Sequence, residues 1–217
     1  MGGTAPHRRT VRALRSFPVL YTSVQLHTIA NTLSAAGALL RRRPEAAEDL
    51  LAQLARYLRD LLGVKRPLVP LADELRLALT FIGVERARMG GRLRLEVACT
   101  PESLATLIPP LVLHPLVENA VQHGIARRPV GGRIRILGRT AGGILHLVVA
   151  DDGPGMRRTA PSGRASGWGL IGVRLRLLAL WGPSARLRIL CGPTAGTIAA
   201  ISLPSTAAPF HRSVALG

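Results

Sequence analysis

The stretch His114-Pro-Leu-Val-Glu-Asn-Ala-Val-Gln-His-Gly124 lies near the middle of the 217-residue chain, and its interpretation decides that of the flanking segments. It follows Pro109-Pro110 and predicts a helix over residues 108–123 that ends at a glycine. An amide oxygen suits a Mg²⁺ ion that keeps several of its waters, so Asn119 is a candidate metal ligand. The adjacent carboxylate of Glu118 can orient water or accept a proton, which makes it a candidate catalytic residue.

Two glycine-containing stretches follow further along the chain. Asp151-Asp-Gly-Pro-Gly155 comes directly after a predicted strand, and Gly167-Trp-Gly-Leu170 opens a predicted helix. Asp151 is a candidate hydrogen-bond acceptor for a buried amine such as that of adenine. Glycine permits positive φ and close backbone approach, and exposed N–H groups at a helix start bind phosphate. The candidate nucleotide-binding residues are therefore Asp151, Gly153, Gly155, Gly167, Gly169 and Leu170. Each stretch alone also fits an ordinary turn or helix cap.

In this order, the three stretches resemble the N, G1 and G2 boxes of the GHKL ATP-binding fold, which histidine kinases share with gyrase B and MutL. Pro-Leu-Val-Glu-Asn-Ala-x-x-His-Gly resembles in particular the sensor histidine kinases of the autolysin-regulator (LytS-like) type. The resemblance covers residues 23–204. It implies that ATP and Mg²⁺ bind here, with Asn119 as the metal ligand and His123 among the nucleotide-binding residues.

Further matches support the same family. The stretch Gly169–Leu177 resembles Gly-Leu-x-Asn-Val-x-x-Arg-Leu, with Gly172 in place of Asn. The predicted helix over residues 71–89 carries the family's Leu-x-x-Glu-Leu…Glu-x-x-Arg pattern through Glu74, Glu85 and Arg88. One departure is Gln122, where the family commonly has Lys. The loop over residues 156–166 would be the ATP lid.

Residues 20–66 show two amphipathic helices on either side of Pro44. One apolar stripe of the first helix consists of Leu26, Ile29, Leu33, Ala36 and Leu40. Two helices cannot enclose a core, so pairing with a second copy as a four-helix bundle is expected, which predicts a homodimer. Residues 67–204 form the predicted ATP-binding domain, which opens with a predicted linker at residues 67–70, and 1–19 and 205–217 are predicted tails.

The fold class predicted from these patterns is α+β: an N-terminal two-helix dimerisation hairpin followed by a GHKL-type α/β sandwich. Residues 92–99 alternate between apolar and mostly charged side chains, which is typical of a half-buried strand. Further strands are predicted at residues 133–137 and 144–150, and a hairpin at 186–190 and 197–203. The sheet is expected to be antiparallel, with helices alternating along the chain.

Residues 23–33 resemble the phosphoacceptor motif of the same family, Gln-x-x-Pro-His-Phe-Leu-Phe-Asn-x-Leu. His27, Asn31 and Leu33 match, whereas the proline and both phenylalanines are replaced by Leu26, Thr28 and Ala30. A neutral imidazole is a competent nucleophile. The resemblance implies that His27 is the phosphoacceptor and a catalytic residue, and the alternative is an ordinary surface histidine.

The resemblance implies an ATP-dependent protein-histidine kinase of a two-component phosphorelay, which phosphorylates His27 and then the receiver domain of a response regulator. One alternative is a degenerate GHKL protein that binds ATP and regulates a partner by docking, which the altered surroundings of His27 and Gln122 favour. Another is a serine kinase acting on an anti-sigma partner, which the helical hairpin disfavours.

Composition narrows the partners. Lys and Arg number 29 against 12 Asp and Glu, but aromatics are only 3%, too few for a base-stacking platform, so we expect no nucleic-acid partner. Two cysteines exclude a disulfide scaffold and a cysteine-based zinc site. Residues 17–40 lack charge but are too polar to span a membrane. We expect a cytoplasmic chain without a transmembrane segment, and a separate sensor subunit as the source of input remains open.

Overall fold

The computed structural model describes residues 22–63, 66–126, 128–155, 167–191 and 196–205. The side chains of residues 22–27 and 167–168 lie outside this description, as do the predicted tails and the predicted lid at residues 156–166. Among the described residues, no helix has the length and apolar character needed to cross a membrane.

The helices are α2 (Thr22–Leu39), α3 (Pro44–Leu62), α4 (Leu71–Arg88), α5 (Pro101–Ala105), α6 (Leu113–Asn119) and α7 (Gly167–Trp181). A π-helical segment, η2 (Ala120–Ile125), continues α6, and a 3₁₀ turn, η3 (Gly182–Ser184), follows α7. The strands are β1 (Val69–Pro70), β2 (Leu93–Cys99), β3 (Leu107–Ile108), β4 (Gly132–Ala141), β5 (Ile144–Asp151), β6 (Arg186–Cys191) and β7 (Thr197–Pro204).

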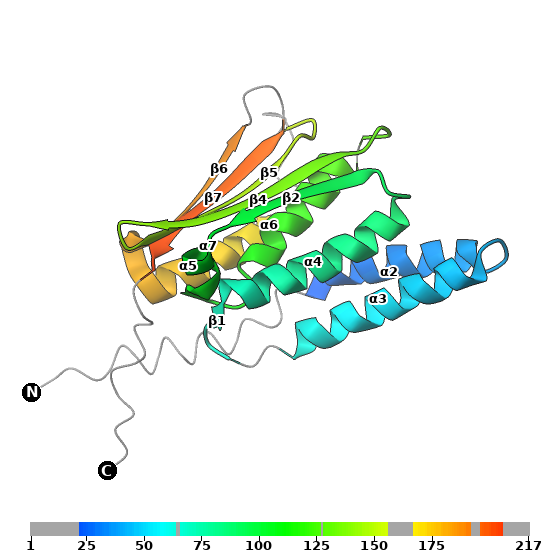
Figure 1. The fold of residues 1–217 in the computed structure, drawn as a ribbon, viewed down its shortest axis with the longest axis horizontal. Helices are drawn as coiled ribbons and strands as arrows, with labels where there is room; N and C mark the ends of the chain where they lie inside the picture. Colours follow the sequence, from blue (N-terminus) through cyan, green and yellow to red (C-terminus); the bar gives the residue numbers. More distant parts are fainter. Residues whose placement is uncertain (1–21, 64–65, 127, 156–166, 192–195, 206–217) are drawn as a thin grey trace, which may run out of the picture.

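Five strands form one sheet in the order β2-β4-β5-β7-β6, and helices α4, α6 and α7 lie on one of its faces (Figure 1). Burial alternates along β4 and β5, because successive side chains of a strand point to opposite faces. The buried side chains of the sheet, such as Ile134, Ile136, Leu145 and Leu147, join one core cluster with the helices. The predicted α+β sandwich is confirmed.

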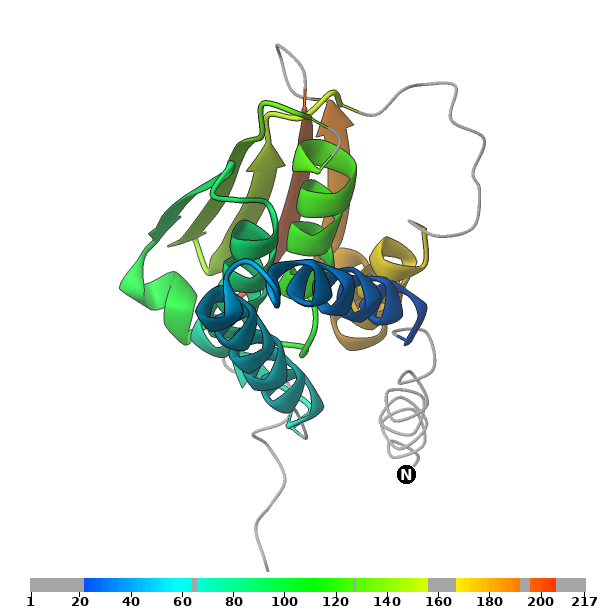
Figure 2. The same ribbon diagram turned by 90° about the vertical axis from the view of Figure 1, so that its right-hand side faces the viewer.

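Helices α2 and α3 form the predicted hairpin, which packs on α4 on the side away from the sheet (Figures 1 and 2). Helix α3 buries one face through residues three or four apart, namely Ala47, Leu50, Leu54, Tyr57 and Leu61. Helix α4 lies between the hairpin and the sheet. It therefore buries residues around much of its circumference, including the two carboxylates Glu74 and Glu85.

Three sequence expectations are wrong in part. The sheet is mixed, since β2 runs parallel to β4. The predicted helix over residues 108–123 begins only at Leu113, after β3, and its last part is π-helical. The predicted linker before residue 71 contains β1, which pairs with β3.

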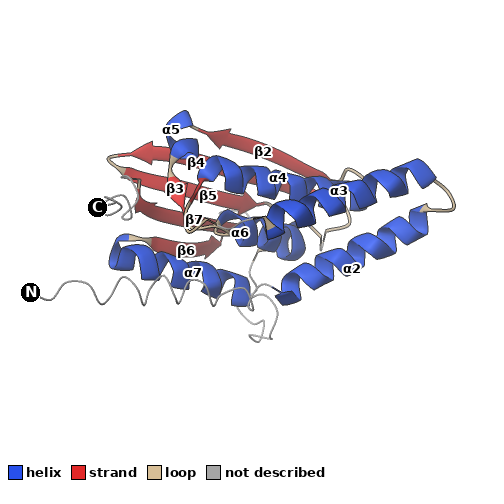
Figure 3. Cartoon of the chain, turned by 90° about the horizontal axis from the view of Figure 1, so that it is seen from below, coloured by secondary structure: helices blue, strands red, loops and turns tan. Residues whose placement is uncertain are grey.

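The apolar stripe of α2 packs within the chain only in part, through Ile29 and Ala36. Thr28, Thr32 and Ala36 are buried, whereas Leu33 and Leu40 are 51% and 54% exposed. The hydroxyl of Thr32 donates a hydrogen bond to the Thr28 carbonyl at 2.8 Å, which lets a polar side chain be buried on this face. The exposed leucines consequently lie on a side of the hairpin that the described residues do not cover. Figure 3 shows the hairpin extending past the sheet.

Candidate nucleotide-binding and catalytic site

Asn119 is the last residue of α6 and is only partly buried. Its Nδ2 donates a hydrogen bond to the Pro115 carbonyl at 2.8 Å, one turn earlier in the helix. This bond orients the amide so that its oxygen points away from the helix carbonyl, as a metal ligand requires. In the described ranges, no group of three or more His, Cys, Asp or Glu side chains is placed to hold a metal ion. The single amide oxygen fits Mg²⁺ held chiefly by substrate phosphates and water.

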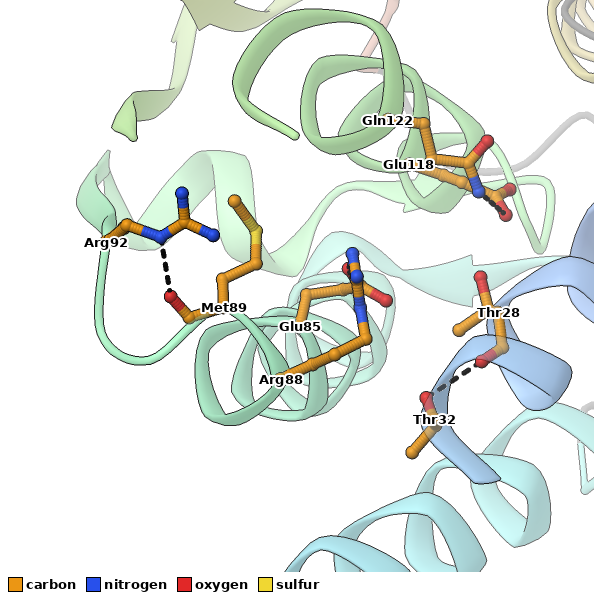
Figure 4. Close-up of polar contacts among 8 residues, drawn as sticks. All are labelled: Thr28, Thr32, Glu85, Arg88, Met89, Arg92, Glu118 and Gln122. Atoms are coloured by element: carbon orange, nitrogen blue, oxygen red, sulfur yellow. Dashed lines mark hydrogen bonds and ion pairs between the residues drawn. The ribbon is translucent and has the colours of Figure 1, made fainter. Parts of the chain in front are cut away.

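Glu118 precedes Asn119 and is nearly buried, and its carboxylate accepts a hydrogen bond from Gln122 Nε2 at 3.2 Å. Gln122, where a lysine is common in the family that the sequence resembles, therefore contacts the candidate base. Burial, and secondarily the negative charge of Glu85, raise the pKa of Glu118 from 4.5 to about 8. Glu85 is itself buried and pairs with Arg88 at 2.6 Å (Figure 4). A carboxylate with a pKa near the working pH suits proton transfer.

The raised pKa gives a pH dependence with a defined sign. At pH 7 only roughly a tenth of Glu118 is ionised, so a rate that needs its carboxylate should rise through about pH 8. Glu85→Gln removes a negative charge and frees the positive charge of Arg88, and both changes lower the pKa of Glu118. We expect the rising limb of autophosphorylation rate against pH to move to lower pH in this variant.

The matched control is Glu96→Gln, which alters an exposed carboxylate on β2 and should leave the profile in place. An unchanged midpoint in Glu85→Gln would contradict the coupling of the two carboxylates. The same shift predicts that the stability contributed by the neutral Glu118 is fully present below pH 4.5 and is lost as pH rises through about 8.

The first and second boxes meet through glycine. A Cβ atom added at Gly124 would lie 2.6 Å from Oδ1 of Asp151, and one added at Gly153 would collide with the backbone of Gly124. Asp151 is buried at the end of β5 and accepts a hydrogen bond from the Gly153 N–H at 2.8 Å, and burial raises its pKa. Gly155 has a φ of +74°, the left-handed conformation that favours glycine. At Gly153, glycine is required because the backbone of Gly124 approaches closely.

The third box reaches the first from the other side. Helix α7 begins at Gly167, and a Cβ atom added at Gly169 would lie 3.4 Å from the Cβ of Pro115 at the start of α6. Leu170 is half-buried and packs on the core. His123 lies in the π-helical segment that follows Asn119. The structure therefore places the described parts of all three boxes around α6.

His27 lies in the second turn of α2, but its side chain is outside the described residues. Its neighbour Thr28 is buried, and within the described part of the chain its hydroxyl has no hydrogen-bond partner. Helix α2 contacts α4, and Figure 4 shows Thr28 in the same view as Glu85 and Glu118. Helix α2, which carries His27, thus packs on α4, and α4 in turn contacts α6 with the candidate base.

The structure assigns other roles to two neighbouring residues. His114, the first residue of the first box, is fully buried, and its Nε2 is 2.9 Å from the hydroxyl of Tyr57 on α3. Burial lowers the pKa of His114 to about 4, so it is neutral and joins the hairpin to α6. Arg128 lies just beyond the first box, and it contacts the carboxylate and carbonyl of Asp152. No sequence pattern indicated either pairing.

Comparison with known proteins gives a consistent result. A protein-family model described as histidine kinase matches residues 16–93. The sensor histidine kinase BtsS of Escherichia coli (strain K12) is 30% identical over 206 residues, covering 94% of this chain and 36% of the relative. The sensor protein LytS of Bacillus anthracis is 28% identical over 195 residues, covering 85% of this chain and 33% of the relative. The chain therefore spans about a third of the length of these two relatives.

Among solved structures, the histidine kinase domain of the Erythrobacter litoralis blue-light activated histidine kinase matches with a TM-score of 0.50 and 20% identity. The match covers 93% of this chain and 96% of that domain, and it shows a shared fold. The three boxes around α6, the hairpin that precedes them and the similarity to BtsS and LytS agree. The chain has a GHKL-type ATP-binding fold, and over most of its length it is similar in sequence to sensor histidine kinases of the autolysin-regulator type.

Proposed function

We propose that this chain is an ATP-dependent protein-histidine kinase that phosphorylates its own His27 and passes the phosphoryl group to a response regulator. ATP would lie between α6 and the glycine-rich stretches, with Asp151 accepting from the adenine amine and the start of α7 facing the phosphates. Mg²⁺ held by Asn119 would neutralise charge on the transferring phosphoryl group.

The groups of this chain and of ATP account for every bond and proton in the proposed phosphoryl transfer. The unprotonated nitrogen of the His27 imidazole forms the P–N bond as the bond from the γ-phosphorus to the bridging oxygen breaks and ADP leaves. The proton on the other ring nitrogen passes to ionised Glu118. The observation that chiefly supports this proposal is the adjacency of an oriented amide at Asn119 and a high-pKa carboxylate at Glu118.

ATP binding tests the proposal before any chemistry. A ligand that binds only the folded state stabilises it, by about 2.7 kcal/mol at a hundredfold excess over Kd. We expect millimolar ATP with Mg²⁺ to raise the thermal midpoint by several degrees. The absence of a shift, with the protein folded, would contradict the proposal.

We propose that the homodimer forms through the outer side of the hairpin. Leu33 on α2 and Leu40 directly after it lie seven residues apart, and together with Leu51 and Leu62 on α3 they leave apolar area exposed. A four-helix bundle with a second copy would bury these side chains. Sedimentation at micromolar concentration should give a dimer for the wild type and a monomer for Leu33→Glu/Leu40→Glu.

The control for the dimer is Leu190→Glu, since Leu190 is similarly exposed at 51% but lies on β6. It should remain dimeric. A monomeric wild type would contradict the homodimer, and a dimeric double variant would place the interface elsewhere.

The receiver domain of a response regulator is the proposed phosphoryl acceptor, because its aspartate-bearing pocket suits a chain with a net charge of +17. The degenerate kinase remains the second candidate, favoured by Thr28 and Ala30 in the positions of the two phenylalanines. ATP binding without any phosphohistidine would favour it. The cytoplasmic location remains a prediction, as does a separate sensor subunit that would supply the signal.

A further inference from the structure

Leu111, which lies shortly before α6, has an unusual backbone conformation. Leu111 has a φ of +60°, and it is the one residue other than glycine with positive φ among those the structure describes. Such a conformation costs on the order of 1 kcal/mol or more for a side chain of this kind and persists only where surrounding contacts impose it. Leu111 also lies two residues before α6, the helix that ends in Glu118 and Asn119.

The contacts that impose this conformation come from α4. Glu74 is 1% exposed, and its two carboxylate oxygens accept hydrogen bonds from the backbone N–H groups of Leu111, Val112 and Leu113, at 2.7, 2.9 and 3.0 Å. The first N–H groups of a helix have no partner within it, and the N-cap residue of α6 supplies no side-chain bond. Glu74 therefore caps α6 from a position 37 residues earlier in the chain.

The carbonyl of the same residue is held from α7. Arg176, 7% exposed, donates a hydrogen bond from Nη1 to the Leu111 oxygen at 3.1 Å. Helix α7 therefore meets the entrance of α6 at Arg176, and two turns earlier it meets Pro115 through Gly169. These two contacts, at Arg176 and at Gly169, fix the rotation of α7 and its position along α6.

We infer that Glu74 and Arg176 are positioning residues, which hold the N–H and the C=O of Leu111 and so fix the helix of Glu118 and Asn119 against the helix that begins at Gly167. Neither residue needs to touch the nucleotide. Asn119 lies about 9 Å along the axis from Leu113, within one rigid helix, so a shift at the entrance moves the metal ligand. A misplacement of 1 Å can cost about a hundredfold in rate. This inference rests on the proposed function.

The experiment measures ATP-Mg²⁺ affinity by calorimetry, and the KM and kcat of autophosphorylation, in the full chain. Arg176→Met should weaken ATP binding at least about tenfold while the far-ultraviolet circular dichroism stays that of the wild type. Arg176→Lys should recover part of the loss, since an ammonium still donates one bond. The controls are Arg174→Met, at an exposed residue of α7, and Asp73→Asn, at a half-buried residue of α4 that pairs with Arg76. Both should bind ATP as the wild type does.

A double-mutant cycle separates positioning from general destabilisation. If Glu74 and Arg176 act on one peptide, Glu74→Gln and Arg176→Met together should weaken binding by less than the product of the separate losses. A variant that merely lowered the folded fraction would lower kcat at an unchanged KM, whereas displaced helices raise KM. If Glu74→Gln does not fold, the Met and Lys variants of Arg176 decide alone.

The inference would be overturned if folded Arg176→Met bound ATP as tightly as the wild type. It would also be overturned if the loss of ATP affinity in the double variant equalled the product of the two separate losses. Both results leave the proposed function standing. A wild type that binds no ATP would overturn the proposed function and this inference with it.

Discussion

Asn119→Ala is expected to reduce autophosphorylation at least about a hundredfold while leaving the protein folded. A metal ion on the transferring phosphoryl group contributes several kcal/mol of charge stabilisation, and each 1.36 kcal/mol is a factor of ten in rate. Asn119 is only partly buried and packs on no core cluster, so its loss should scarcely change stability. The measurement is label from γ-³²P ATP with Mg²⁺, beside circular dichroism of the same sample.

Two further variants sharpen this result. Asn119→Asp keeps an oxygen ligand but loses the donation from Nδ2 to the Pro115 carbonyl, so it should retain an intermediate rate. Gln53→Ala removes the amide of a residue on α3 and should be as active as the wild type. Full activity in Asn119→Ala would show that the metal ligand lies elsewhere.

His27→Gln is expected to abolish the acid-labile label while ATP binding remains. Glutamine retains a polar side chain of similar size but has no nucleophilic nitrogen that can form a phosphoramidate. His146→Gln is the matched control, because His146 lies in β5 far along the chain from the acceptor motif. Label that persists in His27→Gln would place the acceptor on another residue.

The outline of the fold could be predicted because its signals are local. Alternation along β4 and β5 and the three-to-four spacing along α3 predict the element type wherever one face is buried. Strand direction has no such signal, and β2 is parallel to β4 because the chain crosses between them through α6. The π-helical turn after Asn119 has no recognisable sequence pattern either.

The contents of the candidate site were predictable, but not the residues that hold it in place. The boxes identified Glu118, Asn119 and Asp151, because functional residue types recur there at fixed spacing. Glu74 was noticed only as part of a motif, since its partners lie 37 to 39 residues away. Thr28 and Thr32 are buried although polar, because α2 turns this face toward α4 and leaves Leu33 exposed. Such choices depend on tertiary packing, which periodicity within one helix does not encode.

The proposed function depends on phosphoryl transfer from ATP to His27. Mass spectrometry of the wild-type protein measures this transfer directly, after incubation with ATP and Mg²⁺ under alkaline conditions that preserve phosphohistidine. We expect one phosphorylated peptide, with the modification on His27 and the signal lost after acid treatment. Phosphate on a different histidine or on a serine, or ATP binding without any phosphorylated peptide, would contradict it.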